Sequence, residues 1–267
     1  IRAYPRGFSC KSIPFCPAKE KAVQIMDSVP FWGRRGGVHG LKSHDVRYTE
    51  AVRWDIMRVL ILSCATGGGH NDAARGAAQA LTAAGHEAVL LDHYLGMAGG
   101  VAHTAVCQGY VETVRHAPKA FRALYGIGRG ASTGFYKLGV PSPVYWANIG
   151  LAGKLEALLA QEHFDAVVMT HLFPAQTLTY LRHKGAAVPL TVAVATDYTS
   201  IPFWEETDCD WYMVPDTDTA ADFVRRGVPA AKLLPMGIPA PAAFDTGFDR
   251  AAVRAALGFA PDKKYIL

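Results

Sequence analysis

A histidine that follows a run of glycines is the residue best placed for chemistry in this sequence. The run lies between an apolar stretch and an alanine-rich stretch of helical spacing, and consists of Thr66, Gly67, Gly68, Gly69 and His70. Glycines let a ligand approach the backbone closely, and the free N–H groups at the start of a helix favour an anion. An imidazole titrates near neutral pH, so His70 is a candidate general base. The alternative is that His70 only caps the helix or hydrogen-bonds the turn.

Three further polar or aromatic residues stand just past apolar runs. Asp197 could orient His70 or bind a hydroxyl group, or it could cap the next turn. His171 could support the site or be structural. Trp204 could stack on a substrate, although a large aromatic residue after a proline is also typical of core packing. The residue types alone leave both interpretations open. With the family resemblance described below, we expect catalytic roles for His70 and Asp197, and substrate-binding roles for the glycine turn, His171 and Trp204.

The apolar runs predict a regular alternation of strands and helices. Strands are expected at 58–63, 87–92, 165–170, 190–196, 211–214 and 232–236. Helices are expected at 71–84, 150–162, 174–184 and 217–227. This alternation is typical of an α/β, Rossmann-like domain with a mostly parallel sheet covered on both faces. Ligands of such sheets bind at the carboxyl ends of the strands, where His70, His171 and Asp197 would gather.

Residues 96–150 interrupt that alternation and combine cations with aromatic rings. No Asp or Glu occurs from Thr113 to Leu155. The candidates for contact with lipid are Arg115, Lys119, Arg122, Tyr125, Tyr145 and Trp146. Basic side chains with aromatic neighbours suit an anionic membrane surface. The alternative is a helical subdomain whose rings pack inward and whose cations are only solvated.

The formal net charge of +4 comes from the first 56 residues. They hold ten Lys/Arg and five Asp/Glu, whereas the remainder holds 17 and 18, so the charge is no indication of nucleic-acid binding. Residues 1–56 also sustain neither a helical nor a strand period. Three interpretations stay open: a translated region upstream of a start at Met57, a flexible native arm, or a targeting segment. We favour the first.

No apolar run approaches the roughly 20 residues that a membrane-spanning helix needs, so a soluble or peripheral protein is expected. The cysteines after residue 57 are isolated from one another, at Cys64, Cys107 and Cys209. Isolated cysteines indicate a reducing compartment rather than a disulfide framework. No spacing of metal ligands is present, and we expect neither a metal site nor a cofactor.

Four ordered segments resemble the monogalactosyldiacylglycerol synthase family and its bacterial relatives that glycosylate diacylglycerol. They are the glycine turn with its alanine-rich helix, Thr170-His171, Thr196-Asp197 with Trp204, and Met236-Gly237-Ile238-Pro239. The resemblance covers about residues 57–267 and rests on the order and spacing of these segments.

The resemblance implies a GT-B fold, in which an N-terminal Rossmann-like domain receives the lipid and a C-terminal domain holds a UDP-sugar. It implies transfer of galactose or glucose to diacylglycerol with inversion, at the cytoplasmic face of the cell membrane. With a lipid acceptor implied, we favour the lipid-facing interpretation of residues 96–150. A peptidoglycan-type N-acetylglucosaminyltransferase shares the fold and a glycine turn and is one alternative. A non-enzymatic Rossmann-like module that binds a nucleotide is another.

The resemblance also sets the expected domain boundaries. Residues 57–245 would form the acceptor domain, with 96–150 as its lipid-facing insertion. A helix is expected at 251–257, and 263–267 has the pattern of the opening of a strand. Residues 246–267 would then be a linker and the first strand of a donor domain that this chain lacks. We expect such a fragment to be inactive alone.

Overall fold

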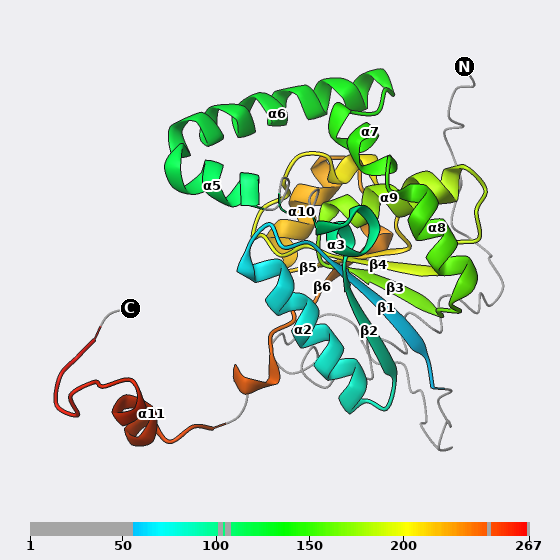
Figure 1. Ribbon diagram of the computed structural model, residues 1–267. Helices are drawn as coiled ribbons and strands as arrows, with labels where there is room; N and C mark the ends of the chain where they lie inside the picture. The colour runs from blue at the N-terminus through cyan, green and yellow to red at the C-terminus, as the bar shows by residue number, and fades with distance from the viewer. Residues whose placement is uncertain (1–55, 101–103, 105–107, 245–246, 266–267) are drawn as a thin grey trace, which may run out of the picture.

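The computed structural model of the protein describes residues 56–100, 104, 108–244 and 247–265. Within them, helices cover both faces of a central six-stranded sheet (Figure 1). All neighbouring strands pair in parallel, in the order β2-β1-β3-β4-β5-β6. The predicted α/β, Rossmann-like sheet is therefore confirmed, and it is the arrangement expected for the N-terminal domain of a GT-B protein. Of residues 1–56, which the sequence analysis sets apart from the domain, only residue 56 is among the described residues.

The elements follow the predicted alternation. The strands are β1 (Arg58–Ser63), β2 (Glu87–Asp92), β3 (Ala166–Met169), β4 (Leu190–Val194), β5 (Trp211–Val214) and β6 (Leu233–Pro235). The helices are α2 (Gly68–Ala83), α3 (His93–Ala98), α5 (Gly109–His116), α6 (Pro118–Leu138), α7 (Pro143–Ile149), α8 (Ala152–Gln161), α9 (Leu172–His183), α10 (Thr217–Arg225) and α11 (Arg250–Ala256). Short 3-10 helices are η2 (Trp204–Glu206), η3 (Ala230–Lys232) and η4 (Ala242–Phe244).

Predicted and observed bounds agree to within three residues for the six strands and for α2, α8, α9 and α10. The expected helix at 251–257 is present as α11. Residues 263–265, where the opening of a strand is expected, are not in a strand and do not pair with the described six-stranded sheet. Residues 266–267 lie outside the described residues.

The central strand β1 is buried on both sides, which explains its uninterrupted apolar sequence. Leu60 and Leu62 enter the core that α8 and α9 cover, whereas Val59 and Ile61 enter the core that α2 covers. All four side chains are fully buried. Burying one such side chain contributes about 1.5–3 kcal/mol, so packing on both faces fixes the position of the strand.

The strand order reverses at β1, and this reversal positions the glycine turn. The chain passes from β1 to β2 on one side and later to β3 on the other. Segments leaving the carboxyl ends of β1 and β3 therefore diverge, which is where open α/β sheets bind ligands. Helix α2 begins there at Gly68, three residues earlier than predicted, so His70 lies in its first turn.

The insertion, helices α5 to α7, is tied to the domain by buried polar groups. Figure 1 shows these helices (green) together on one side of the molecule. The Glu206 carboxylate accepts hydrogen bonds from the backbone N–H (2.8 Å) and hydroxyl (2.7 Å) of Ser142, the N-cap of α7. Gln176 of α9 donates to the same carboxylate at 3.0 Å and accepts from Asn148 of α7 at 2.7 Å. Asn148 in turn accepts from the Tyr94 hydroxyl at 2.6 Å.

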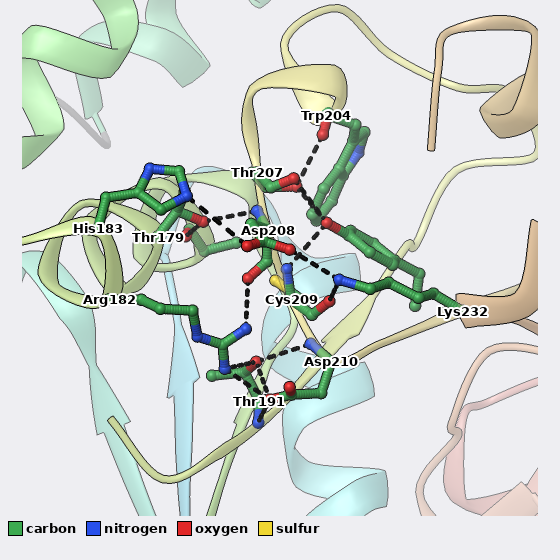
Figure 2. Close-up of polar contacts among 12 residues, drawn as sticks. Thr179, Arg182, His183, Thr191, Trp204, Thr207, Asp208, Cys209, Asp210 and Lys232 are labelled. Carbon is green, nitrogen blue, oxygen red and sulfur yellow. Dashed lines mark hydrogen bonds and ion pairs between the residues drawn. The ribbon is translucent and has the colours of Figure 1, made fainter. Parts of the chain in front are cut away.

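A second polar network braces the opposite, amino-terminal edge of the sheet (Figure 2). The Asp210 carboxylate accepts from the Arg182 guanidinium at 2.6 Å and from the backbone N–H of Thr191 at 2.8 Å. Lys232 donates to the Asp208 carboxylate at 2.7 Å. These contacts join the end of α9 to the starts of β4 and β5, far from the glycine turn, so their role is structural.

Two of the isolated cysteines, Cys64 and Cys209, are buried. Burial raises the pKa of the Cys209 thiol to about 12, so this side chain stays protonated at neutral pH. Cys107 lies outside the described residues.

Gly76, in the interior of α2, provides a test of the packing. A Cβ atom at this position would lie 2.6 Å from the carbonyl carbon of Ala240, in the segment that crosses the helix after β6. The same segment is held by a 2.8 Å hydrogen bond from Ala242 N to Gln79. Gly→Ala inside a helix ordinarily stabilises by about 1 kcal/mol. We expect Gly76→Ala instead to lower the free energy of unfolding by about 1–3 kcal/mol, measured by urea titration.

Gly130→Ala in α6 is the matched control, because a Cβ atom there meets nothing within 4 Å in the part of the chain that the structure describes. This substitution should raise the free energy of unfolding by up to about 1 kcal/mol. A comparable gain at Gly76 would show that the Ala240 backbone does not pack against the helix.

Candidate active site

The segments that follow β1, β3 and β4 meet at the carboxyl edge of the sheet. In register, Met169 of β3 lies beside Leu62 of β1 and Ala193 of β4. The residues just past these three strands are therefore level with one another. His70, at the start of α2, and His171, at the start of α9, both lie at this edge, as the sequence predicts.

The ring of His70 is held in a defined orientation. Its Nδ1 atom lies 2.9 Å from the carbonyl oxygen of Thr170 and 2.8 Å from the hydroxyl oxygen of Thr196. A carbonyl oxygen only accepts hydrogen bonds, so Nδ1 must carry the proton. The Nε2 atom on the far side of the ring then carries an unshared electron pair, and among the described residues no hydrogen bond reaches it. His70 is partly exposed, so Nε2 is available to accept a proton from a ligand.

The charge state of His70 suits that role. Burial lowers the pKa of His70 below its ordinary value, and the hydrogen bond to Thr170 and the charge of Asp197 offset only part of this shift. The imidazole is therefore neutral at neutral pH, with the Nε2 electron pair free.

The ring of His171 packs against the ring of His70. The two rings meet edge to face with their centroids 4.5 Å apart. The Nδ1 atom of His171 accepts from the backbone N–H of Phe173 at 3.2 Å, which caps the start of α9. Burial lowers the pKa of His171 well below its ordinary value, and His70 and His93 lower it further. A buried, neutral capping residue fits the structural interpretation of His171 and its support of the neighbouring ring.

His93 is a third histidine here, which the sequence analysis missed. It begins α3, is fully buried, and its Nε2 atom lies 3.3 Å from the Thr177 hydroxyl. Burial lowers the pKa of His93 to about 4. The described part of the chain contains no group of three or more His, Cys, Asp or Glu residues arranged to hold a metal ion.

The glycine turn is open on its outer side. Among the described residues, Cβ atoms built at Gly67 and Gly69 would meet nothing within 4 Å, and one at Gly68 would meet only the Asp72 carboxylate at 3.8 Å. No side chain caps the helix at Gly67. The first backbone N–H groups of a helix have no partner within it, so this open turn can receive an anionic group. The Thr66 hydroxyl beside it is buried, with no hydrogen-bond partner among the described residues.

Two polar contacts that the sequence analysis missed hold the turn in place. The Asp92 carboxylate, at the end of β2, accepts from the backbone N–H of Ala65 at 2.9 Å. The Ser63 hydroxyl, at the end of β1, donates to the Asn71 side chain at 2.5 Å. The sequence signal that could have identified these contacts is a polar residue at the end of an apolar strand. Ser63 and Asp92 both have this position.

Asp197 lies beside the site without contacting the histidine ring. Its side chain is exposed, just past β4, and it acts on His70 through its charge. The groups that hydrogen-bond His70 are the Thr170 carbonyl and the Thr196 hydroxyl. The expected orienting contact is therefore made by the residue preceding Asp197, which leaves Asp197 free to bind a hydroxyl group.

Trp204 lies in the hydrophobic core. Its exposed fraction is 3%, and its ring packs against Tyr212 and Phe223 with centroids 6.3 and 5.8 Å away. A ring enclosed in this way has no face for stacking on a substrate. The structure therefore favours the packing alternative for Trp204.

The insertion exposes only part of the predicted lipid-binding set. Arg115 of α5 and Lys119 and Arg122 of α6 are exposed. In α7 the exposed fraction is 58% for Trp146 and only 7% for Tyr145, so Tyr145 cannot face lipid in this conformation. Tyr125 lies in α6, but its side chain is outside the described residues. None of the helices described is both long enough and apolar enough to cross a membrane.

Comparisons with known proteins identify the family of the chain. The family model described as monogalactosyldiacylglycerol (MGDG) synthase matches residues 70–240, more than half of the chain. A processive diacylglycerol beta-glucosyltransferase of Bacillus mycoides (strain KBAB4) is 26% identical over 212 residues, which cover 79% of this chain and 52% of that protein.

A second relative with the same name, from Staphylococcus haemolyticus (strain JCSC1435), is 32% identical over 115 residues, which cover 43% of this chain and 29% of that protein. The chain thus spans about half the length of one curated relative and less than a third of the other. The matched segment contains His70, His171, Thr196 and Asp197. The chain therefore belongs to the monogalactosyldiacylglycerol (MGDG) synthase family.

Proposed function

We propose that this chain is the acceptor half of a glycosyltransferase that transfers a hexose from a UDP-sugar to diacylglycerol. The observation that carries the proposal is the orientation of His70 at the carboxyl edge of the sheet. Its Nδ1–H is bound to Thr170, and no hydrogen bond from the described residues reaches its Nε2. Membership of the family and the names of the curated relatives support the same reaction class.

In the proposed reaction Nε2 of His70 takes the proton of the diacylglycerol hydroxyl group. The oxygen attacks the anomeric carbon of the sugar as the bond from that carbon to the UDP oxygen breaks. The electron pair of that bond leaves with UDP, and the proton stays on the imidazole. A single displacement of this kind inverts the anomeric centre.

The glycine turn and Asp197 are assigned to substrate binding. The start of α2 offers unpaired N–H groups and the positive end of the helix dipole, both of which stabilise the charge of a leaving diphosphate. Asp197 is exposed beside His70, where its carboxylate can accept a hydrogen bond from a sugar or glycerol hydroxyl. We place the nucleotide contacts on a further C-terminal domain of the GT-B fold, with the UDP-sugar as the donor substrate.

The sugar is galactose or glucose. The family description names a galactolipid and the curated relatives are glucosyltransferases, so both donors are candidates. We propose that the protein works as a peripheral enzyme on the cytoplasmic face of the cell membrane. There the exposed cations of α5 and α6 and the Trp146 ring would contact anionic lipid.

His70→Ala tests the base. In the full-length protein, assayed with diacylglycerol vesicles and UDP-galactose or UDP-glucose, this substitution should lower kcat at least about a hundredfold, because the hydroxyl proton then lacks an acceptor. His163→Ala is the control, since His163 is exposed between α8 and β3, at the amino edge of the sheet. Wild-type kcat in the His70 variant would refute the assignment.

The pH dependence of kcat/KM provides an independent test. The base must be neutral, and burial holds the pKa of His70 below 6.5. Activity should therefore persist from neutral pH downward and decline only as the pH falls through a midpoint below 6.5. This acidic limb should be absent in the residual activity of His70→Ala. An acidic midpoint above 6.5 would conflict with the burial of this imidazole.

Charge removal tests membrane docking. Replacing Arg115, Lys119 and Arg122 by Ala should weaken cosedimentation with phosphatidylglycerol vesicles by roughly two orders of magnitude, at about 1 kcal/mol for each cation. The matched control removes the same charge from exposed residues outside the insertion, at Lys184, Arg225 and Lys263. Equal losses in both triple variants would show that only net charge matters, and unchanged binding of the first would exclude the surface.

A further inference from the structure

Thr196 contacts His70 from a distant part of the chain, and neither its sequence position nor the family match assigns it a role. The hydroxyl oxygen lies 2.8 Å from Nδ1 of His70, although the two residues are 126 positions apart. Thr196 is two residues past the end of β4 and partly exposed. Thr196 lies in neither a helix nor a strand, and its hydroxyl group makes this contact with His70.

The hydrogen-bond chemistry at Nδ1 determines what the hydroxyl does. The Thr170 carbonyl, 2.9 Å from the same nitrogen, requires that Nδ1 carry the proton. The Thr196 oxygen must then be a second acceptor for that N–H, because a hydroxyl proton cannot point at a protonated nitrogen. The two acceptors approach from different strands, one after β3 and one after β4. Together they restrict rotation of the ring, whereas a single acceptor would leave it free to pivot.

We propose that Thr196 is a positioning residue that holds His70 in the tautomer and orientation needed for its Nε2 atom to act as the base. The inference rests on the proposed function for its effect on catalysis, but the ring orientation can be tested without it. When Nε2 takes a proton, the imidazolium charge is shared with Nδ1–H, and both acceptors then bind that group more strongly. Thr196 thus favours the protonated state of His70 and assists the proton transfer.

The groups that face His70 define the electrostatic background. They are the buried, neutral ring of His171 and the exposed carboxylate of Asp197, with His93 behind His171. Removing the Thr196 hydroxyl changes none of these charges. A change in the titration of His70 would therefore report the lost hydrogen bond rather than an altered charge nearby.

Thr196→Val is the test, because valine keeps the shape of threonine and removes only the hydroxyl group. The titration and tautomer of His70 are measured by nitrogen NMR of the full-length protein labelled in histidine, with the resonance assigned by its absence in His70→Gln. We expect the valine variant to lower the pKa of His70 by about half a unit to one unit and to increase the fraction of ring with the proton on Nε2. In the transferase assay kcat should fall about tenfold while KM changes less than about twofold.

Two further variants make the outcome decisive. Thr196→Ser restores the hydroxyl and should return both the titration and kcat to within about twofold of wild type. Thr199→Val makes the same chemical change at an exposed threonine of the same segment, with no effect expected on either readout. A valine variant that folds, as judged by its Tm, and titrates like wild type would overturn the proposal, as would a failure of serine to rescue it.

The NMR and kinetic results separate this inference from the proposed function. A shifted His70 titration in a protein that transfers no sugar from either donor would uphold the positioning role and refute the transferase. A loss of activity in Thr196→Val with an unchanged titration would refute the positioning role and leave the transferase intact.

Discussion

The shared parallel register of β1, β3 and β4 is the constraint on which the site depends. His70 is separated by 100 residues from Thr170 and by 126 from Thr196, and yet one ring nitrogen reaches both. That contact requires the ends of the three strands to be level. A single hydrogen bond contributes only about 1 kcal/mol, less than burial of one large apolar side chain. Packing on both faces of the strands therefore sets the register, and the polar contacts follow from it.

The same burial controls the chemistry of the histidines. Desolvation lowers the pKa of His70, His171 and His93, so a cluster of imidazoles exists without mutual repulsion between charged rings. Of these three histidines, only His70 is also partly exposed. The difference in exposure separates one group that can exchange a proton with a ligand from two that support it.

The insertion obeys a different constraint. Its helices need a fixed attachment to present an outer surface, and a chain of buried and partly buried hydrogen bonds through Glu206, Gln176 and Asn148 provides one. Each buried polar group in this chain needs its partner, because an unpaired one costs about 1–3 kcal/mol. The attachment fixes how α7 faces the domain, so that Tyr145 is enclosed and the adjacent Trp146 is exposed.

The sequence by itself determined the six strands, the helices α2, α8, α9, α10 and α11, and the segment that holds the candidate base His70. Apolar runs located the six strands, the glycines located the start of α2, and the placement of His70 followed from both. These features are local, because strand periodicity and helix starts depend on neighbouring residues. The surroundings of Thr196, Trp204 and Tyr145 were decided only by the tertiary structure, because they come from segments distant in the chain. No local pattern distinguishes a threonine that contacts a distant histidine, or an aromatic ring that is enclosed, from one that faces solvent.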